Sequence, residues 1–395
     1  MSEWKVLTAE EFCDSVRDGT HDTPRQVECG YKLVTAKHIS NGQIDLSDAY
    51  LISESDYLKI NERSKVERWD VLMSMIGNGL GKSAVVKDNP QYAIKNLALF
   101  KIGDETRAKW LHYYLSSNKG QGFIYNSLQG SGQPFISLSL LRKFPIPVPD
   151  DEKIMRKVVA TLSRYDSLIE NYQKQIKLLE EAAQRLYKEW FVDLHFPGHE
   201  NTKIIDGVPE GWEKKPISHL GEYLNGFAFK PSDWQESGKP IIKIKEMGNG
   251  VSNDTPRNDG ERVPAKYLVK AGDLLFSWSA TLMVIVWSGE EGWLNQHLFK
   301  VTPAKGIGRE FLLQSISNTI KEFLNLTTGS TMKHIQRNKL DQVFVNVPND
   351  KIMKLYDHAA EKMRDEILHL SSQIRLLTEA RDRLLPKLMS GEMEV

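Results

Sequence analysis

The hydrophobic pattern is clearest from Asp151 to Phe191, where apolar residues recur at alternating spacings of three and four and the interior contains no Gly or Pro. This spacing is typical of a coiled-coil seam rather than of a strand. The seam positions are Ile154, Val158, Leu162, Tyr165, Ile169, Tyr172, Ile176, Leu179, Ala183 and Leu186. At ~1.5 Å per residue, a helix of this length spans about 60 Å. The pattern therefore predicts a spacer or an arm.

A second helix of the same kind follows Pro348, and it aligns with the first without a gap: Ile154-Met155 matches Ile352-Met353. Its seam positions are Ile352, Tyr356, Ala360, Met363, Ile367, Leu370, Ile374, Leu377 and Leu384. One position differs, because Arg381 stands where Ala183 does. An exposed apolar seam is unstable in water, so each helix needs a partner and the other helix is the nearest candidate. The pattern does not decide between pairing within one chain and pairing between chains.

The segment before the first helix has a mixed pattern of short strands and turns. It predicts strands at Tyr31–Val34 and Asp70–Ser74, a short helix at Trp110–Ser116, and an extended exit over Phe144–Pro149 that Pro keeps out of helix. Turn signals occur at Asn41-Gly42, Gly77-Asn78-Gly79 and Gly130-Ser131-Gly132. This segment is expected to be a separate mixed α/β domain.

A second mixed segment from Ile217 to Pro348 repeats the plan of the first. Four matches keep their order: Lys37–Gly42 with Lys245–Gly250, Asp70–Ser74 with Asp273–Ser277, Asn96–Lys101 with Asn295–Lys300, and Gly130-Ser131 with Gly329-Ser330. The period is about two hundred residues, too long for a solenoid repeat. We therefore predict an α+β protein in which a domain and its helix are duplicated, with boundaries at residues 1–150, 151–196, 197–348 and 349–395.

The composition is that of an ordinary globular chain of two or three domains: 395 residues, 40% hydrophobic and 26% charged. A net charge of zero argues against indiscriminate nucleic-acid binding but allows a specific binder with local basic residues. Cys13 and Cys29 are too few for a disulfide scaffold or a zinc site. No long apolar run or signal peptide is present, so we expect a cytoplasmic protein without a membrane span.

Three segments resemble catalytic motifs but lack a required feature. Gly77–Ser83 is one residue short of a phosphate-binding loop, and Asn89–Tyr92 lacks the second proline of the adenine-methyltransferase motif. Pro149–Lys153 imitates the acidic motif of nucleases, but its residues are contiguous where a helix begins and simply favour the cap and the dipole. A duplicated enzyme would need matched acid, base or metal residues in both halves, and the aligned positions are apolar or Gly, Asn and Ser. The sequence therefore predicts a chain without catalytic residues.

Two related but diverged domains on a long spacer hold two similar binding surfaces apart. If the helices run antiparallel, a pseudo-two-fold axis relates the domains. This arrangement suits the recognition of a split, asymmetric sequence on a DNA duplex, where the spacing of half-sites follows from the symmetry of the protein.

Across its whole length, the chain resembles the specificity subunit of Type I restriction-modification systems. The segments that carry the resemblance are Asp18–Pro24, Arg185–Asp193 with Phe196–His199, Leu275–Ser279, Leu294–His297 and Arg383–Glu392. The helices begin with Glu152-Lys153 and Asp350-Lys351 where the family commonly has Glu-Gln.

The resemblance implies two target recognition domains and an antiparallel coiled coil. It also implies a subunit that carries no cofactor and catalyses nothing. Two modification subunits, which carry S-adenosylmethionine, would bind to it and methylate adenine in double-stranded DNA. Motor-nuclease restriction subunits, which use ATP and magnesium, would be bound through the modification subunits. The alternative is a coiled-coil scaffold, or a specificity-like DNA-binding subunit of another defence system.

Base readout needs paired donors and acceptors, and phosphate contacts need basic, hydroxyl or bare amide groups. Basic and amide-rich turns at equivalent places in the two halves are therefore the candidate DNA contacts. They contain Lys37, His38, Asn78, Lys82, Gly130, Ser131, Gln133, Arg142, Lys245, Ser277, Ser279, Ser330, Thr331, Lys333, His334, Gln336 and Arg337. Gly-rich turns are often only turns, and His38 is also expected as a structural hydrogen-bonding group.

The helix ends are the candidate contacts with modification subunits. Their residues are Tyr187, Trp190, Phe191, Leu385 and Leu388. Anchoring of the helix end is an equally good explanation for Trp190 and Phe191.

Overall fold

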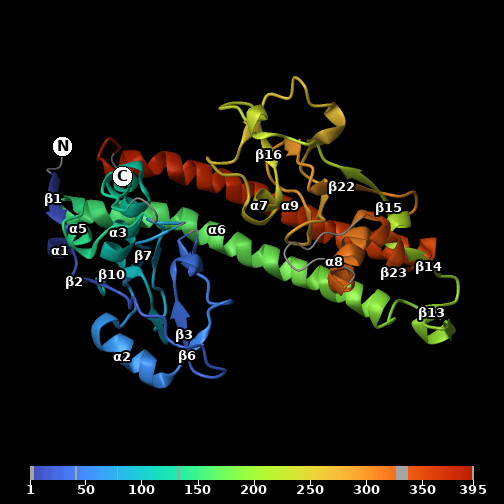
Figure 1. Cartoon of the computed structure of the whole chain (residues 1–395), viewed down its shortest axis with the longest axis horizontal. Helices are drawn as coiled ribbons and strands as arrows, with labels where there is room; N and C mark the ends of the chain where they lie inside the picture. Colours follow the sequence, from blue (N-terminus) through green and yellow to red (C-terminus); the bar gives the residue numbers. More distant parts are fainter. Residues whose placement is uncertain (1–3, 41, 78, 131–133, 326–336, 394–395) are drawn as a thin grey trace. The chain divides into compact units, whose positions relative to one another are not determined.

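The computed structural model describes residues 4–40, 42–77, 79–130, 134–325 and 337–393 (Figure 1). The chain forms two compact units: unit 1 contains Met1–Ser167 and Leu377–Val395, and unit 2 contains Leu168–Leu376. Two long helices, α6 (Glu152–Tyr187) and α9 (Asp350–Met389), pass from one unit into the other. Each unit therefore contains one half of both predicted helices.

Unit 1 is built on three antiparallel or mixed sheets and the short antiparallel pair β4-β5. A four-stranded antiparallel sheet has the order β2-β10-β7-β8, a three-stranded sheet has the order β6-β3-β9 with β3 parallel to β9, and β1 pairs with β11. The bounds are β1 Trp4–Thr8, β2 Ser15–Asp18, β3 Tyr31–Val34, β4 Ile39–Ser40, β5 Gln43–Ile44, β6 Leu51–Ile52, β7 Val71–Ser74, β8 Ser83–Val85, β9 Tyr92–Ile94, β10 Leu97–Lys101 and β11 Pro145–Pro149. The predicted strands and the extended exit are confirmed.

The helices of unit 1 close its core against the four-stranded sheet. Asp104 caps α3 by accepting a hydrogen bond from the Arg107 amide at 2.8 Å, and Trp110 of α3 is fully buried. The same core contains Leu162 from α6 and Leu388 from α9, so the start of one long helix runs against the end of the other in the opposite direction. The other bounds are α1 Ala9–Phe12, η1 Ala36–His38, α2 Glu54–Ser64, α3 Glu105–Ser116, α4 Asn118–Asn126 and α5 Leu138–Arg142.

Unit 2 repeats this arrangement of sheets. Its four-stranded antiparallel sheet has the order β15-β22-β19-β20, a second sheet has the order β17-β16-β21-β18 with β16 parallel to β21, and β14 pairs with β23. The bounds are β12 Ile204–Ile205, β13 Val208–Pro209, β14 Glu213–Pro216, β15 Gly221–Asn225, β16 Lys239–Ile242, β17 Arg257–Asn258, β18 Leu268–Val269, β19 Leu274–Ser277, β20 Met283–Val286, β21 Gly292–Leu294, β22 Leu298–Pro303 and β23 Phe344–Val347.

The core of unit 2 is rich in aromatic side chains where the long helices meet α8 (Arg309–Asn325). Helix α6 ends in a π-helical turn, Lys188–Val192, whose Phe191 contacts Phe311 of α8 and Tyr356 of α9 with ring centroids 4.9 and 4.8 Å apart. The end of α6 thus packs against the start of α9, again in opposite directions. The short helices of this unit are α7 Ile244–Asn249, η3 His199–Asn201, η4 Ile217–Leu220, η5 Pro231–Asp233, η6 Ala265–Tyr267 and η7 Arg337–Gln342.

The pairing of the strands confirms the predicted duplication but corrects one of its matches by two residues. Leu97 pairs with Ser74 in unit 1 as Leu298 pairs with Ser277 in unit 2. The match of Asn96–Lys101 with Asn295–Lys300 had instead made Gln296 the counterpart of Leu97. The close approach of backbone to backbone is also repeated: a Cβ atom added at Gly19 would lie 2.4 Å from the Ile94 carbonyl oxygen. The same atom at Gly226 would lie 2.2 Å from the Asn295 carbonyl oxygen. Only glycine fits at either position, so the two units share a constraint as well as a topology.

The seam residue Arg381 is explained by its partners in unit 1. Its Nη1 lies 2.8 Å from Oδ1 of Asp166 on α6, and Oδ2 of Asp166 accepts a hydrogen bond from the Tyr113 hydroxyl of α3 at 2.5 Å. The polar seam position therefore joins both long helices to α3. No helix in the described part of the chain has the length and hydropathy needed to cross a membrane.

Candidate nucleic-acid interface

Two candidate loops of unit 1 are joined by backbone hydrogen bonds. The Met75–Lys82 loop connects β7 to β8, and the Gln129–Ser137 loop precedes α5; we call their described residues the loop pair. The Ile136 amide donates to the Met75 carbonyl at 3.0 Å, and the Gly77 amide donates to the Pro134 carbonyl at 3.2 Å. Loops about fifty residues apart in the sequence therefore form one surface.

The loop pair exposes groups suited to DNA. Lys82 is exposed and forms no ion pair with a described residue, so its ammonium is free to meet a phosphate. Gly130 is exposed and its positive φ of 88° presents bare backbone. Phe135 of the second loop forms a bridge with Ile76 of the first loop, and its side chain is 38% exposed. The two loops that carry the candidate residues Lys82 and Gly130 are joined, which the sequence alone did not indicate.

The first turn after the equivalent strands β7 and β19 is shaped by a buried serine. Ser277 is fully buried, and its hydroxyl donates to the Thr281 carbonyl at 2.6 Å. Ser277 also donates to the Ser279 carbonyl at 3.2 Å. Ser74 in unit 1 makes the bond that corresponds to this second one, to the Ile76 carbonyl at 3.4 Å. Ser279 is also buried. Ser277 and Ser279, which were candidates for the DNA groove, lie inside the protein and brace the turn.

Lysines at equivalent places in the two units each face an aspartate. Lys37 Nζ lies 2.7 Å from Asp48 Oδ2, and Lys245 Nζ lies 2.5 Å from Asp254 Oδ2. The hydrogen bond from Lys37 lowers the pKa of Asp48, and that from Lys245 lowers the pKa of Asp254 to about 2. Both pairs are largely exposed, so water screens them. The two lysines are accessible but their charges are already balanced.

His38 is buried beside the first of these pairs. The Thr35 amide donates to its Nδ1 at 2.8 Å, which leaves the proton on Nε2, 3.2 Å from Asp48 Oδ1. Burial lowers the pKa of His38, although the nearby Asp48 charge opposes this. The ring therefore acts as the structural hydrogen-bonding group that the sequence also suggested.

The remaining candidate DNA contacts have separate positions. Arg142 is exposed at the end of α5, where its Nε donates to the Val16 carbonyl at 3.3 Å. The backbone of Arg337 begins η7. Asn78, Ser131, Gln133, Ser330, Thr331, Lys333, His334 and Gln336 lie outside the described residues.

The five candidate partner contacts lie in the chain's own cores. Tyr187 and Phe191 are 5% and 6% exposed, and Trp190 packs against the same aromatic cluster of unit 2. Leu385 and Leu388 are buried in the core of unit 1. These side chains anchor the helix ends, and contact with another subunit stays a prediction.

Sequence reasoning did not identify a cation–π contact in unit 2. Lys243 Nζ lies 4.4 Å from the ring centroid of Trp234, which is 49% exposed. Burial lowers the pKa of Lys243. Eight residues of loop and strand lie between Trp234 and Lys243 in the sequence, so no helical or strand spacing could have paired them.

The Asp18–Pro24 segment is held by its histidine. His21 Nδ1 lies 2.9 Å from Asn96 Oδ1, and its Nε2 lies 3.1 Å from Asp18 Oδ2. Arg63 Nη2 also contacts Asp18 at 2.9 Å. The segment is therefore fixed to the β9–β10 turn, and His21 has a structural role.

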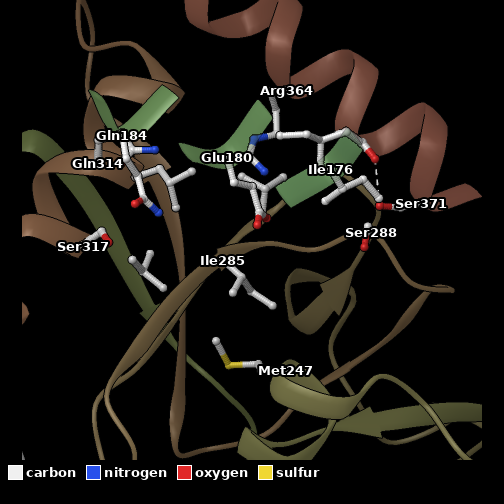
Figure 2. A pocket seen from close by; sticks show the side chains of 14 residues that line it. Ile176, Glu180, Gln184, Met247, Ile285, Ser288, Gln314, Ser317, Arg364 and Ser371 are labelled. Carbon is white, nitrogen blue, oxygen red and sulfur yellow. Dashed lines mark hydrogen bonds between the residues drawn. The ribbon is translucent and has the colours of Figure 1, made fainter. Parts of the chain in front are cut away.

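A cavity of about 360 Å³ lies in unit 2 beside both long helices (Figure 2). Glu180 of α6 and Arg364 of α9 line one side, while Ile285 of β20 and Met247 of α7 line the other. Arg364 is committed elsewhere, because its Nε lies 3.1 Å from both carboxylate oxygens of the buried Glu310. The charged wall of this cavity thus joins α8 to α9.

The described residues contain no group of three or more His, Cys, Asp or Glu side chains placed to hold a metal ion. Burial raises the pKa of the Cys13 thiol to about 12, so this cysteine is protonated.

The fold and the exposed loops define a duplicated recognition protein: two copies of one α+β domain with unlike loops, joined through two long helices. The model of the Type I restriction modification DNA specificity domain matches residues 1–181 and 209–359, which is most of the chain. The chain belongs to this family. It is a DNA-recognition subunit of the Type I restriction-modification class.

Individual relatives agree with the family model. The chain is 25% identical over 311 residues to the Type I restriction enzyme MjaIX specificity subunit of Methanocaldococcus jannaschii, covering 74% of this chain and 70% of that protein. It is 22% identical over 405 residues to the HindI specificity subunit of Haemophilus influenzae, covering 84% and 88%.

A solved structure shares the fold. The crystal structure of the Type I restriction-modification S subunit from M. genitalium superposes with a TM-score of 0.54 at 14% identity, covering 98% of this chain and 96% of that one. The predicted fold class is confirmed.

Proposed function

We propose that this chain selects a bipartite, asymmetric DNA sequence, with one half read by each unit. The observation that supports this most is the combination of one shared framework with two different surfaces. The four-stranded antiparallel sheets of the two units have equivalent strand orders, but the turn after β7 carries Lys82 whereas the turn after β19 carries Ala280 and Thr281. A framework that repeats while its exposed side chains differ suits two related but unlike half-sites.

We also propose that α6 and α9 set the spacing of the half-sites. Both helices begin in one unit and end in the other, and both are anchored in the two cores. A continuous helix is stiff over this length, so the gap between the specific halves would have a single value.

The same helices would dock two modification subunits. Exposed leucines support this, because large apolar side chains on a helix surface commonly mark contacts with another protein. Leu178 of α6 is 64% exposed, and Leu376 of α9 is 48% exposed. The candidate contacts Tyr187, Trp190 and Phe191 would support these surfaces from beneath.

The chemistry would be supplied by the partners. Modification subunits would carry S-adenosylmethionine and methylate adenine, and restriction subunits recruited through them would use ATP and magnesium. This chain would contribute no catalytic group. Its residues would position the partners on the chosen sequence.

The test uses the chain assembled with its modification subunits. Nuclease protection of a DNA that contains the target should cover two short regions with an unprotected gap. Lengthening or shortening the gap by one base pair should abolish protection of one half. Protection that tolerates any gap would contradict the proposal.

The scaffold alternative predicts a different outcome. If the chain only holds other DNA-binding subunits together, substituting Lys333, Arg337 and Arg142 by Ala leaves the DNA affinity of the complex unchanged. A loss of affinity in these variants, with the complex still assembled, supports direct recognition by this chain.

A further inference from the structure

Backbone hydrogen bonds hold Phe135, an aromatic residue of the loop pair, on both of its backbone edges. The Phe135 amide donates to the Gln129 carbonyl at 3.0 Å, and the Gln129 amide donates to the Phe135 carbonyl at 2.9 Å. Phe135 also forms an antiparallel bridge with Ile76. The residues on either side of it bond to the Met75–Lys82 loop as described above. Moving the backbone of Phe135 outward would break this set of bonds, so the point from which its side chain extends is fixed.

The position of the ring is unusual for a phenyl group. Phe135 is 38% exposed, although Ile136 beside it is fully buried and apolar side chains of unit 1 fill a core nearby. Its own loop also contains the exposed Gly130, and the other loop of the pair contains the exposed Lys82, which forms no ion pair with a described residue. An apolar ring among groups suited to phosphate and base contacts points toward DNA rather than toward a protein core.

The degree of exposure decides which kind of DNA contact is possible. A side chain that wedges between base pairs must protrude from the protein for most of its length. Most of Phe135 is covered and its backbone is bonded on both edges, so it cannot enter the base stack. An exposed ring edge can still meet the 5-methyl group of thymine, the apolar feature of the major groove.

We propose that Phe135 is a specificity-determining residue that contacts the 5-methyl group of one thymine in the half-site read by unit 1. This inference rests on the proposed function, since it needs that unit to face DNA. It adds that the half-site contains a thymine whose methyl group contributes to recognition.

The test removes only the methyl group. In the target found for the wild-type complex, each thymine is replaced in turn by deoxyuridine, and the affinity of the assembled complex is measured. At one thymine, the replacement should lower the affinity of the wild-type complex about four-fold, which is the effect of losing the burial of one methyl group. The Phe135→Ala complex should show no loss from the same replacement, and Phe135→Leu should retain part of it.

Two results would overturn the inference. Either no thymine shows methyl dependence in the wild-type complex, or the dependence persists in Phe135→Ala. Leu58→Ala is the matched control, because Leu58 is 57% exposed on α2 and should keep the wild-type pattern. If Phe135→Ala does not fold, Phe135→Leu supplies the same comparison. Failure of the proposed function is a separate result, since it would appear as a wild-type complex without a two-part target.

Discussion

At the scale of single residues, accessibility and pairing divide the candidate DNA contacts. Lys37 and Lys245 have their charges balanced by Asp48 and Asp254, and Lys82 has no such partner among the described residues. A phosphate contact contributes more binding free energy when it is made by a free ammonium than when the ammonium must first give up a carboxylate partner. The candidates therefore are not equivalent.

We expect Lys82→Ala to weaken DNA binding by several-fold for all sequences and to reduce the slope of log affinity against log salt by about one. Lys37→Ala is the matched control, and its effect should be smaller. The affinity and its salt dependence are measured for both variants by titrating salt against DNA binding of the assembled complex. Equal effects of the two substitutions would show that the carboxylate partner does not matter.

Asp357 of α9 gives a pH-dependent prediction. Its burial, together with the charges of Glu361 and Glu310, raises the pKa of Asp357 to about 6, although Arg309 opposes the shift. An unfolded aspartate titrates near pH 4. The folded state therefore binds the proton more tightly, and stability falls as pH rises from about 4 through about 6.

Asp357→Asn removes the charge, so the variant should melt a few degrees higher than the wild type at pH 7.5. The two melting temperatures should converge below about pH 4, where both side chains are neutral. Calorimetry across this pH range is the measurement, with Asp365→Asn as a control because Asp365 is mostly exposed. A constant difference at every pH would contradict the account.

At the scale of elements, α8 is joined to α9 by a buried ion pair. Glu310 is 1% exposed, and its carboxylate is bound by Arg364 and also approached by Arg309 at 3.3 Å. Burial raises the pKa of Glu310, and the two arginines oppose this. Removing one partner of such a pair leaves an uncompensated charge.

We expect Arg364→Met to destabilise unit 2 by about 3 kcal/mol. The double variant Glu310→Met with Arg364→Met should recover most of that loss, since two apolar side chains of similar volume replace the pair. Thermal unfolding of the purified chain compares the variants. A double variant as unstable as the single one would show that the arginine stabilises α8 by packing alone.

The same elements show what the sequence could predict. Seam residues such as Leu162 and Ala360 were recognised because helical periodicity is local, and both are buried. The partner of the odd seam residue Arg381 could not be predicted, because Asp166 lies 215 residues away. Ser277 ends a buried strand, and alternation alone does not say whether its hydroxyl meets solvent or turns back to the Thr281 carbonyl.

The loop pair shows the same limit for the site. Lys82 and Gly130 were chosen for their residue type and their place in turns. The joining of their two loops depends on the backbone hydrogen bonds of Gly77 and Ile136, which no local pattern encodes. The exposure of Phe135 is likewise a property of the assembled fold.

At the scale of the whole molecule, the duplication is the feature that carries the functional account. A single gene product holds two copies of one sheet framework and two halves of each long helix. The repeated glycines Gly19 and Gly226 conserve the framework between the copies, while the exposed turns differ. The central claim is that this arrangement selects a two-part DNA sequence.

The most direct test is single-molecule sequencing of adenine methylation in a host that expresses this chain with its neighbouring modification gene. The account predicts one methylated motif, with two short specific halves around a non-specific gap of fixed length. A continuous motif, or no motif although the complex assembles, would contradict it.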